Sequence, residues 1–418
     1  MLIMFRTKNF ASFKDDVVLD LRKTSYKQHP SHTFKINEHE LLKTVAIYGA
    51  NASGKSNLIR AIYEFKKLII SQFYMDLESS KNIEISNSSV EITPFLLADK
   101  IDDNVEFEIV FYHKDRMFQY GYTIEKSLII SEWLLVDNKE VFERENENII
   151  FGSEYKEILK HYTKYREDRL YISTLDYFIT EDKIKSIIDA LKEYIIEKLD
   201  IYKEIILETS IKSDINMFML RPNIIKNDKF KVKISEYIRQ IDVGIEEIII
   251  EKEKLKLSNM KEEKEVEVAK TVHPIYDENG KKIGKKVFDI YQESSGTVRF
   301  LSYIQYIVEL IEDGGVFIVD ELSSRLHPLL TKFIVDIFQS DLNKSNAQLI
   351  FTTHEVSIMN NNQFRRDEVA IVDKDVAGRS TLYTLSDLQI REDATFNKDY
   401  FKGKYGGIPI ISDVLLER

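Results

Sequence analysis

Residues 49–56 constrain this chain more than any other stretch. They read Gly-Ala-Asn-Ala-Ser-Gly-Lys-Ser, which matches the phosphate-loop pattern G-x-x-x-x-G-K-[ST]. The run 44–48 before them is short, apolar and β-branched, which is typical of a buried central strand. After them, apolar residues recur at three- and four-residue spacing: Leu58, Ala61, Ile62, Phe65 and Ile69. The sequence therefore predicts a loop between a strand and a helix that opens at about Gly54.

Each residue type in this loop suits phosphate binding. Glycines let the backbone amides turn inward around phosphate oxygens, and the helix start adds partial positive charge. We expect Lys55 to reach the β and γ phosphates and the Ser56 hydroxyl to ligate the Mg²⁺ that bridges them. The residues expected to bind the nucleotide are Gly49, Asn51, Ala52, Ser53, Gly54, Lys55, Ser56 and Asn57. The alternative, a glycine-rich turn that merely links strand to helix, is disfavoured by the flanking pattern.

Length and composition limit the class of protein. At 418 residues the chain exceeds the size at which one core keeps growing, so two structural units are expected. The 43% hydrophobic fraction is that of a globular protein, and 31% charged residues suggests long solvated helices. The net charge of −11 argues against a protein that coats nucleic acid, but it leaves room for a local basic groove.

The sequence contains no cysteine, which rules out disulfides and thiolate metal sites and suits a reducing compartment. Its first residues lack the basic start and apolar core of a secretory signal, and no run of about 18 apolar residues occurs. We therefore expect a cytoplasmic protein with no membrane partner.

The patterns before residue 150 are those of strands. Runs at 2–6 and 17–21 predict a hairpin at a sheet edge. Aromatic-rich alternating runs at 105–111, 118–124 and 132–136 predict an antiparallel sheet with one solvated face.

From about 153 to 240 the pattern becomes helical. One apolar stripe contains Ile184, Ile187, Ile188, Leu191, Tyr194 and Ile195. The Pro222-Asn223 pair predicts a bend or a pair of helices. Strand-like runs return at 245–250 and 286–290, and the charged run 251–267 between them predicts a solvated loop or hairpin tip.

A second strand carries acids that suit the same site. The apolar run 316–319 ends in Asp320 and Glu321, which is the pattern of a Walker B element. A carboxylate at the end of a buried strand beside the phosphate loop would hold Mg²⁺, which fits Asp320. Glu321 would accept a proton from an attacking water. The alternative is an acid pair that caps a helix after an ordinary strand.

The apolar run 348–353 ends in His354, again at a strand end where ligands of open α/β sheets collect. A neutral histidine there would hydrogen-bond the γ phosphate and orient the water, although a lone histidine is usually structural. The other histidines considered, His327, His161 and His273, lack this context and are expected to cap helices or lie at the surface.

A serine-glycine run, Ser294, Ser295 and Gly296, precedes a helix with apolar residues at 298, 301, 304, 308 and 311. Such a helix start suits anion binding. It is also simply a good helix cap, so it carries little information by itself.

The order of these motifs resembles an ABC-type ATPase of the branch that includes SMC and DNA-repair ATPases. The resemblance covers residues 1 to about 75 and 285–375 and implies ATP, Mg²⁺ and an α/β ATPase head. In that family the serine-glycine signature of one protomer completes the ATP site of another. The resemblance therefore implies a homodimer, or a higher oligomer, that sandwiches ATP with Ser294, Ser295 and Gly296.

A narrower likeness links the chain to the stand-alone ATPases related to OLD, RloA and AbiLi. It rests on residues 8–13, 293–297, 320–328 and the tail 400–409, Tyr-Phe-Lys-Gly-Lys-Tyr-Gly-Gly-Ile-Pro. Members of that group commonly act in prokaryotic anti-phage systems beside a separately encoded effector, often a nuclease.

Two features depart from transporter-type ABC domains. No glutamine clearly matches the Q-loop, although Gln119 or a residue near Pro94-Phe95-Leu96 could lie in that region. The D-loop aspartate is missing, because residues 326–328 read Leu-His-Pro.

Together these patterns predict an ABC-type P-loop ATPase head of the α/β class, with a mixed sheet, an antiparallel β subdomain and an inserted helical domain. The expected divisions are 1–152 for the first half of the head, 153–242 for the insertion and 243–418 for the second half. The predicted function is an ATP-gated regulator of an effector, with Lys55, Glu321 and His354 as catalytic residues and Ser56 and Asp320 as metal ligands.

Two other functions stay open. An SMC-like ATPase would bind DNA, but the insertion is short for a DNA-embracing arm. A nuclease of the OLD type would use the acids of Asp373-Lys374-Asp375, but only about 45 residues follow them, too few for another α/β domain.

Overall fold

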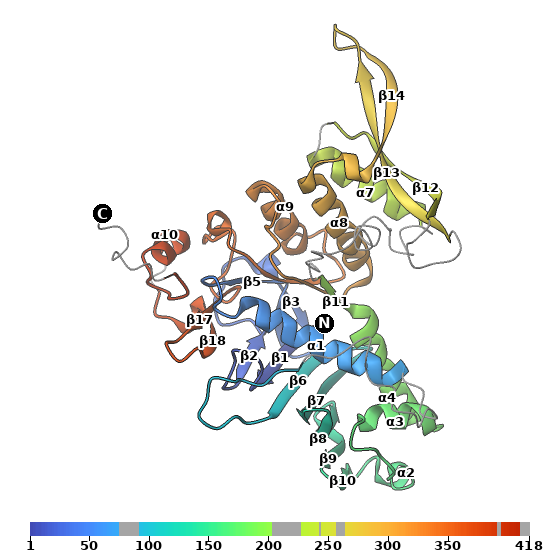
Figure 1. Ribbon diagram of the computed structural model, residues 1–418, viewed down its shortest axis with the longest axis vertical. Helices are drawn as coiled ribbons and strands as arrows, with labels where there is room; N and C mark the ends of the chain where they lie inside the picture. The colour runs from blue at the N-terminus through green and yellow to red at the C-terminus, as the bar shows by residue number, and fades with distance from the viewer. Residues whose placement is uncertain (75–91, 203–226, 242–243, 256–263, 391–393, 410–418) are drawn as a thin grey trace.

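The centre of the protein is a six-stranded sheet with the order β11-β15-β16-β5-β17-β18 (Figure 1). The computed structural model describes residues 1–74, 92–202, 227–241, 244–255, 264–390 and 394–409. The strands are β5 (Thr44–Tyr48), β11 (Leu199–Tyr202), β15 (Val316–Val319), β16 (Gln348–Thr352), β17 (Val369–Lys374) and β18 (Ser380–Thr384). All neighbours run parallel except β17 and β18. The predicted α/β class with a mixed sheet is confirmed.

Strand β5 lies inside this sheet because both of its faces are apolar. Val45 and Ile47 belong to one hydrophobic core, while Ala46 and Tyr48 belong to the other. All five residues of β5 are buried. A continuous apolar strand of this kind is stable only with helices or sheets on both sides, which is what the structure provides.

Helix α1 (Lys55–Tyr74) covers one face and is sandwiched against a second, antiparallel sheet. That sheet has the order β10-β9-β8-β7-β6-β1-β2. Its strands are β1 (Leu2–Lys8), β2 (Val17–Asp20), β6 (Asn104–His113), β7 (Arg116–Glu125), β8 (Leu128–Val136), β9 (Lys139–Glu145) and β10 (Asn148–Phe151). Phe65 of α1 stacks on Tyr122 with ring centres 5.5 Å apart and meets Phe5 edge-on. The predicted edge hairpin and antiparallel sheet are confirmed, and the sheet continues through two strands that were not predicted.

The other face of the central sheet is covered by α8 (Ser295–Asp313), α9 (Pro328–Gln339) and, near the carboxyl end, α10 (Phe396–Phe401). A small hairpin of β3 (Thr33–Ile36) and β4 (His39–Leu42) precedes β5. No helix among the described residues is both long and apolar enough to cross a membrane.

The stretch expected to be helical contains α2 (Lys156–Leu159), α3 (Tyr171–Phe178), α4 (Asp182–Glu193) and a π-helical turn at Tyr194–Lys198. All six residues of the predicted apolar stripe are buried. The stretch also contains β11, which was not predicted and which pairs in parallel with β15. This part of the chain is therefore built into the central sheet. Helix α7 (Asp228–Ile241) follows, and Pro222-Asn223 lies outside the described residues.

A three-stranded ribbon extends from this body beyond α7 and α8 (Figure 1). It consists of β12 (Glu247–Leu255), β13 (Lys264–Tyr276) and β14 (Lys282–Asp289). The run 251–267, predicted to be a solvated loop or hairpin tip, forms no loop where it is described: 251–255 and 264–267 are paired antiparallel strands, and the connection 256–263 lies outside the described residues. Charged residue types do not prevent this pairing, because backbone groups make the hydrogen bonds between strands.

Candidate functional site

The phosphate loop lies between β5 and α1, and two of its glycines are required by the backbone. Gly49 and Gly54 have φ values of 154° and 118°. A Cβ atom on Gly49 would lie 2.3 Å from the carbonyl oxygen of Val372, and one on Gly54 would lie 2.5 Å from Ser380 Oγ. Both distances are too short for any real side chain, so only glycine allows the loop to close against β17 and β18.

Lys55 begins α1 and its side chain bends back over the loop. The Lys55 ammonium donates hydrogen bonds to the carbonyl oxygens of Gly49 and Ala50, each at 2.9 Å. Burial lowers the pKa of Lys55, and the negative charges of Glu321 and Asp320 partly oppose that shift. The ammonium group of Lys55 therefore lies on the loop, close enough to Asp320 and Glu321 for their charges to affect it.

The loop fits a phosphate group. Ser53 is buried, and its hydroxyl finds no hydrogen-bond partner among the described residues. A buried polar atom without a partner costs free energy unless a ligand satisfies it. Ser56, Asn51 and Ala52 are exposed beside it, so an anion can approach the helix start.

The sheet order brings the predicted acids and histidine to the same edge as the loop. Strand β16 lies between β15 and β5, and all three run parallel. Asp320 and Glu321 follow β15, His354 follows β16 by two residues, and the loop follows β5. The carboxyl ends of parallel strands meet at one edge, which is where open α/β sheets bind ligands.

Thr352 connects these groups, although sequence reasoning did not identify it. Its hydroxyl donates to Asp320 Oδ1 at 2.6 Å and accepts from the backbone amide of Glu321 at 2.7 Å. Thr352 is fully buried, so this contact fixes both acids relative to β16. Thr353 forms similar contacts: its hydroxyl lies 2.8 Å from Ser323 Oγ and accepts a hydrogen bond from the Glu355 amide.

Glu321 and His354 remain open to solvent beside these fixed groups. Glu321 has a φ of 55°, an uncommon conformation for a residue with a side chain, and such residues cluster at functional sites. Partial burial of the His354 ring and the Lys55 charge lower the pKa of His354, and the charges of the two acids partly oppose this shift. His354 is therefore neutral at pH 7, which a hydrogen bond to a phosphate or water permits.

Two serines outside the nucleotide-binding motifs support the loop. Ser380 Oγ donates to the Ser53 carbonyl at 2.5 Å, and the Ser380 amide donates to the carbonyl of Ser12. Asn57, predicted to bind the nucleotide, donates its side-chain amide to Ser12 Oγ at 2.8 Å. A single serine carries no sequence pattern of its own. Ser12 could have been noticed only because it belongs to the family motif at 8–13.

The serine-glycine run begins α8. Ser294 is the N-cap, and its hydroxyl accepts from the Thr297 amide at 3.1 Å. Ser294 and Ser295 are exposed, and a Cβ on Gly296 would lie 3.1 Å from the carbonyl oxygen of Arg325.

Glu293 connects the helix start to the ribbon. Its carboxylate accepts from the Thr271 hydroxyl and lies 2.7 Å from His273 Nε2. His273 was expected to cap a helix or lie at the surface; instead it is part of this contact. His327 does cap α9, accepting from the Leu329 amide at 3.2 Å.

The Q-loop candidates occupy different places. Gln119 lies in β7 and donates to Glu108 at 3.2 Å, within the antiparallel sheet. The segment near Phe95 instead lies beside the N-terminal turn: the Phe95 amide donates to Asn9 Oδ1, and the Ala11 amide donates to the Thr93 carbonyl. Only this segment neighbours the turn that holds Ser12.

The acids considered for a nuclease have local partners. Asp375 accepts from the amides of Ala377 and Arg379 and forms an ion pair with Arg379 at 2.7 Å, which is a turn-stabilising arrangement. In the described part of the chain, no group of three or more His, Cys, Asp or Glu side chains is placed to hold a metal ion.

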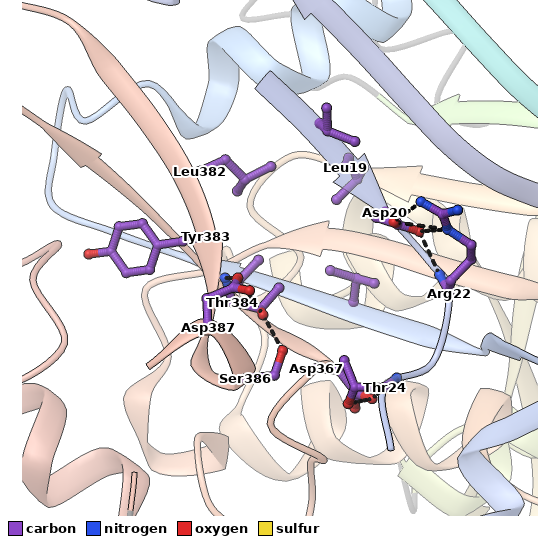
Figure 2. A pocket seen from close by; sticks show the side chains of 13 residues that line it. Leu19, Asp20, Arg22, Thr24, Asp367, Leu382, Tyr383, Thr384, Ser386 and Asp387 are labelled. Carbon is purple, nitrogen blue, oxygen red and sulfur yellow. Dashed lines mark hydrogen bonds and ion pairs between the residues drawn. The ribbon is translucent and has the colours of Figure 1, made fainter. Parts of the chain in front are cut away.

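A separate cavity of about 170 Å³ lies between β2, β17 and β18 (Figure 2). No phosphate-loop residue lines it. Its charged groups are already paired: Arg22 with Asp20, and the Thr24 hydroxyl with Asp367 at 2.6 Å. Thr384 and Asp387 bond to each other in the same way. This saturation distinguishes the cavity from the phosphate loop.

The sequence matches the model of one known protein family. A family model described as "AAA domain, putative AbiEii toxin, Type IV TA system" matches residues 45–360, about three quarters of the chain. No curated protein sequence matches the chain.

Solved structures show limited similarity. The SMC head domain from Thermotoga maritima is 14% identical with a TM-score of 0.44, covering 93% of this chain and 99% of that one. The Pyrococcus furiosus Smc head with an extended coiled coil, bound to the C-terminal domain of ScpA, is 14% identical with a TM-score of 0.43, covering 96% and 98%. The family match spans the phosphate loop, both acids and His354, so the chain belongs to this AAA-domain family of P-loop ATPases.

Proposed function

We propose that this protein binds ATP with Mg²⁺ at the edge formed by β5, β16 and β15, and hydrolyses it. The observation that carries the proposal is the meeting of Lys55, Asp320, Glu321 and His354 at the carboxyl ends of three adjacent parallel strands. Both acids oppose the lowering of the pKa of Lys55 and of His354, which agrees with the closeness that the strand order implies.

Each side chain has a distinct role in the proposed reaction. The loop amides and Lys55 bind the β and γ phosphates, where the positive charge offsets the charge that develops during transfer. Ser56 and Asp320 would hold Mg²⁺, which when bound neutralises phosphate oxygens. Glu321 accepts the proton of the attacking water, and neutral His354 positions that water or the γ phosphate.

We further propose that two protomers close on ATP through the start of α8. Ser294 and Ser295 are exposed at a helix N-terminus, where backbone amides can bind a phosphate of a second protomer. Glu293 joins this start to β13, so closure would also displace the ribbon. The ATP-bound dimer would then differ in shape from the free protomer and act as a switch.

The biological role we propose is control of a partner effector, such as a separately encoded nuclease, in prokaryotic defence against phage. The description of the matching family, a toxin of a toxin–antitoxin system, supports a defensive role. The residue motifs shared with OLD-, RloA- and AbiLi-related ATPases support the same role. We also propose that the head comprises residues 1–152 and 243–418, and that the inserted stretch 153–242 contributes β11 to its central sheet. The protein would act in the cytoplasm.

The test is ATP hydrolysis by purified Lys55→Ala and Glu321→Gln variants. Each should lose roughly 10²-fold or more in rate, since one loses the cation at the phosphates and the other the base. Lys332→Ala on the exposed face of α9 serves as the matched control and should keep the wild-type rate. Wild-type rates in both site variants would contradict the assignment.

Dimerisation is tested with the Glu321→Gln protein, which should retain ATP. Its mass by light scattering should double with ATP and Mg²⁺ and should remain that of a monomer with ADP. A Ser294→Arg substitution should abolish the ATP-dependent dimer without unfolding the protein. A variant that dimerises equally without nucleotide would contradict the sandwich.

A further inference from the structure

The end of the described chain packs on the phosphate loop. We call residues 396–409 the tail segment; it contains α10 and the glycine-rich run that follows. Figure 1 draws α10 beside β17 and β18, and it contacts the short 3-10 turn at Val356–Ile358 that follows His354. The tail motif was noted in the sequence, but nothing in the proposed reaction uses it.

Tyr400 anchors the tail segment beside Gly49. Its ring is buried and lies 6.2 Å from the ring of Tyr48, the last residue of β5. Its hydroxyl donates to the Gly407 carbonyl at 2.7 Å. Burial and the charge of Asp373 raise the pKa of Tyr400 to about 12, against a smaller lowering effect of the Gly49 backbone, so the hydroxyl keeps the proton that it donates.

Two consecutive glycines let the tail backbone reach the loop. Gly406 and Gly407 have φ values of 72° and 63°. A Cβ on Gly407 would lie 2.7 Å from Ile371 Cγ2 and 3.3 Å from Gly49 Cα. A Cβ on Gly406 would lie 2.5 Å from the Tyr383 hydroxyl and 2.7 Å from Asp373 Oδ2. Residue types with side chains would push the tail away from the first residue of the phosphate loop.

Further contacts hold the tail segment from the β18 side. The Tyr383 hydroxyl donates to the Tyr405 carbonyl at 2.6 Å, and Tyr405 is buried in the same core as Tyr48. Asp399 pairs with Lys404 at 2.6 Å, which closes the turn between α10 and the glycines. These bonds fix the tail at the one point where β5 ends and the loop begins.

We propose that the tail segment is a positioning element of the nucleotide site, which holds Gly49 in its phosphate-binding conformation and is in turn held by bound nucleotide. The inference rests on the proposed ATP binding and extends it to residues outside every nucleotide motif. Gly49 lies against both the Val372 carbonyl and Gly407, so the tail segment packs on the residue whose backbone conformation is unusual.

Mutual stabilisation follows from linkage. If the docked tail favours the loop conformation that binds phosphate, bound nucleotide must favour the docked tail by the same factor. A tail that merely covered the core would affect unfolding and leave nucleotide affinity unchanged. The two possibilities therefore differ in how tail variants change the affinity for nucleotide.

The experiment compares Gly407→Ala with Gly403→Ala in the full chain, using titration with fluorescent mant-ATP and thermal unfolding. Gly403 also has a positive φ of 72°, but a Cβ there would meet only the end of the Ile408 side chain. We expect about tenfold weaker mant-ATP binding for Gly407→Ala and less than about twofold for Gly403→Ala. If Gly407→Ala does not fold, Tyr400→Phe decides, since it keeps the ring and removes the hydroxyl; we expect about threefold weaker binding.

A second readout follows trypsin cleavage after Lys402 and Lys404, which are exposed. A non-hydrolysable ATP analogue should slow this cleavage in the wild type and leave it unchanged in Lys55→Ala. If the wild type binds mant-ATP but these variants bind it equally well and cleavage ignores nucleotide, the tail proposal is wrong while the ATP site stands. If the wild type binds no mant-ATP, both proposals fail.

Discussion

The two ends of strand β5 place polar side chains in opposite environments. At the carboxyl end, Glu321, His354 and Ser56 are exposed around the phosphate loop. At the amino end, Thr44 begins the strand in a buried network centred on Glu368, which is fully buried. The same strand thus has one end with groups available to a ligand and one end with groups that bond only within the protein.

Glu368 shows how complete the amino-end network is. Its carboxylate accepts from the Thr44 hydroxyl, from the Arg365 amide at 2.8 Å and from Gln339 Nε2 at 3.3 Å. His32 Nδ1 lies 2.9 Å from it. Every lone pair has a partner, which is the condition under which buried polar groups stabilise a fold.

The two ends of β5 therefore separate the groups that stabilise the fold from the groups available to a ligand. Groups at the amino end are satisfied in the folded chain and have nothing left to offer a ligand. Groups at the carboxyl end retain unsatisfied atoms, such as Ser53 Oγ, and an uncommon backbone conformation at Glu321. We expect substitutions at one end to change unfolding and at the other to change turnover.

The largest effect is expected for Glu368→Ala. It leaves several buried donors without an acceptor, at about 1–3 kcal/mol each, so unfolding free energy should fall by about 4 kcal/mol or more. Urea unfolding measures this, with Asp341→Ala, an exposed acid at the same end, as the control. Turnover per folded molecule should stay unchanged; a large change in turnover would break the division between the two ends.

Asp320→Asn should give the next largest effect, but on the ATPase rate and not on unfolding free energy. Asparagine can still accept from the Thr352 hydroxyl, so the local geometry is kept while the charge is removed. The ATPase rate should fall by about 10²-fold, with little change in unfolding free energy. A destabilisation similar to that of Glu368→Ala would show that Asp320 serves mainly to stabilise the fold.

A smaller effect is expected when either of two buried threonines is replaced by valine. Thr352→Val removes the hydroxyl that connects Asp320 and Glu321, which should lower turnover by about tenfold. Thr44→Val, at the opposite end of β5, should instead cost about 1–2 kcal/mol of stability with normal turnover. Turnover and unfolding free energy are measured for both variants, and the same pair of changes in both would contradict the separate roles of the two ends.

The smallest effect concerns the protonation of His354. Its pKa lies below its ordinary value because of burial first and the Lys55 charge second. In Lys55→Ala the pKa should rise, since one lowering cause is gone, but it should stay below the ordinary value. An NMR titration measures this, with the His354 signal identified by its loss in His354→Gln. An unchanged pKa in Lys55→Ala would show that the two side chains do not interact.

The parts of the fold that follow a local rule could be predicted from the sequence. Strand β5, the start of α1 and the acid-bearing strand each have an apolar pattern with a clear end. The nucleotide roles of residues 49–57, 294–296, Asp320, Glu321 and His354 stay predictions, but the sheet does bring the loop, the acids and His354 to one edge.

Other parts depend on contacts that no local pattern reveals. Strand β11 is a four-residue run directly after a helix, and only its pairing with β15 makes it a strand. Thr352, Ser12 and Ser380 act through single hydroxyls whose partners are 31 or more residues away in sequence. The Ser380 hydroxyl and the Ser53 carbonyl, for example, are separated by 327 positions. Such contacts exist only after the sheet has assembled.

The order of the central sheet also has a consequence for how the protein is made. Strand β5 leaves the ribosome early, but its neighbours β16 and β17 begin only at residues 348 and 369. At synthesis rates of about 5–20 residues per second, this apolar strand waits about 15–60 s for its first partner. During that time the nascent chain contains a largely apolar strand without its neighbours in the sheet, so the yield of the protein in cells should depend on chaperones that cover such segments.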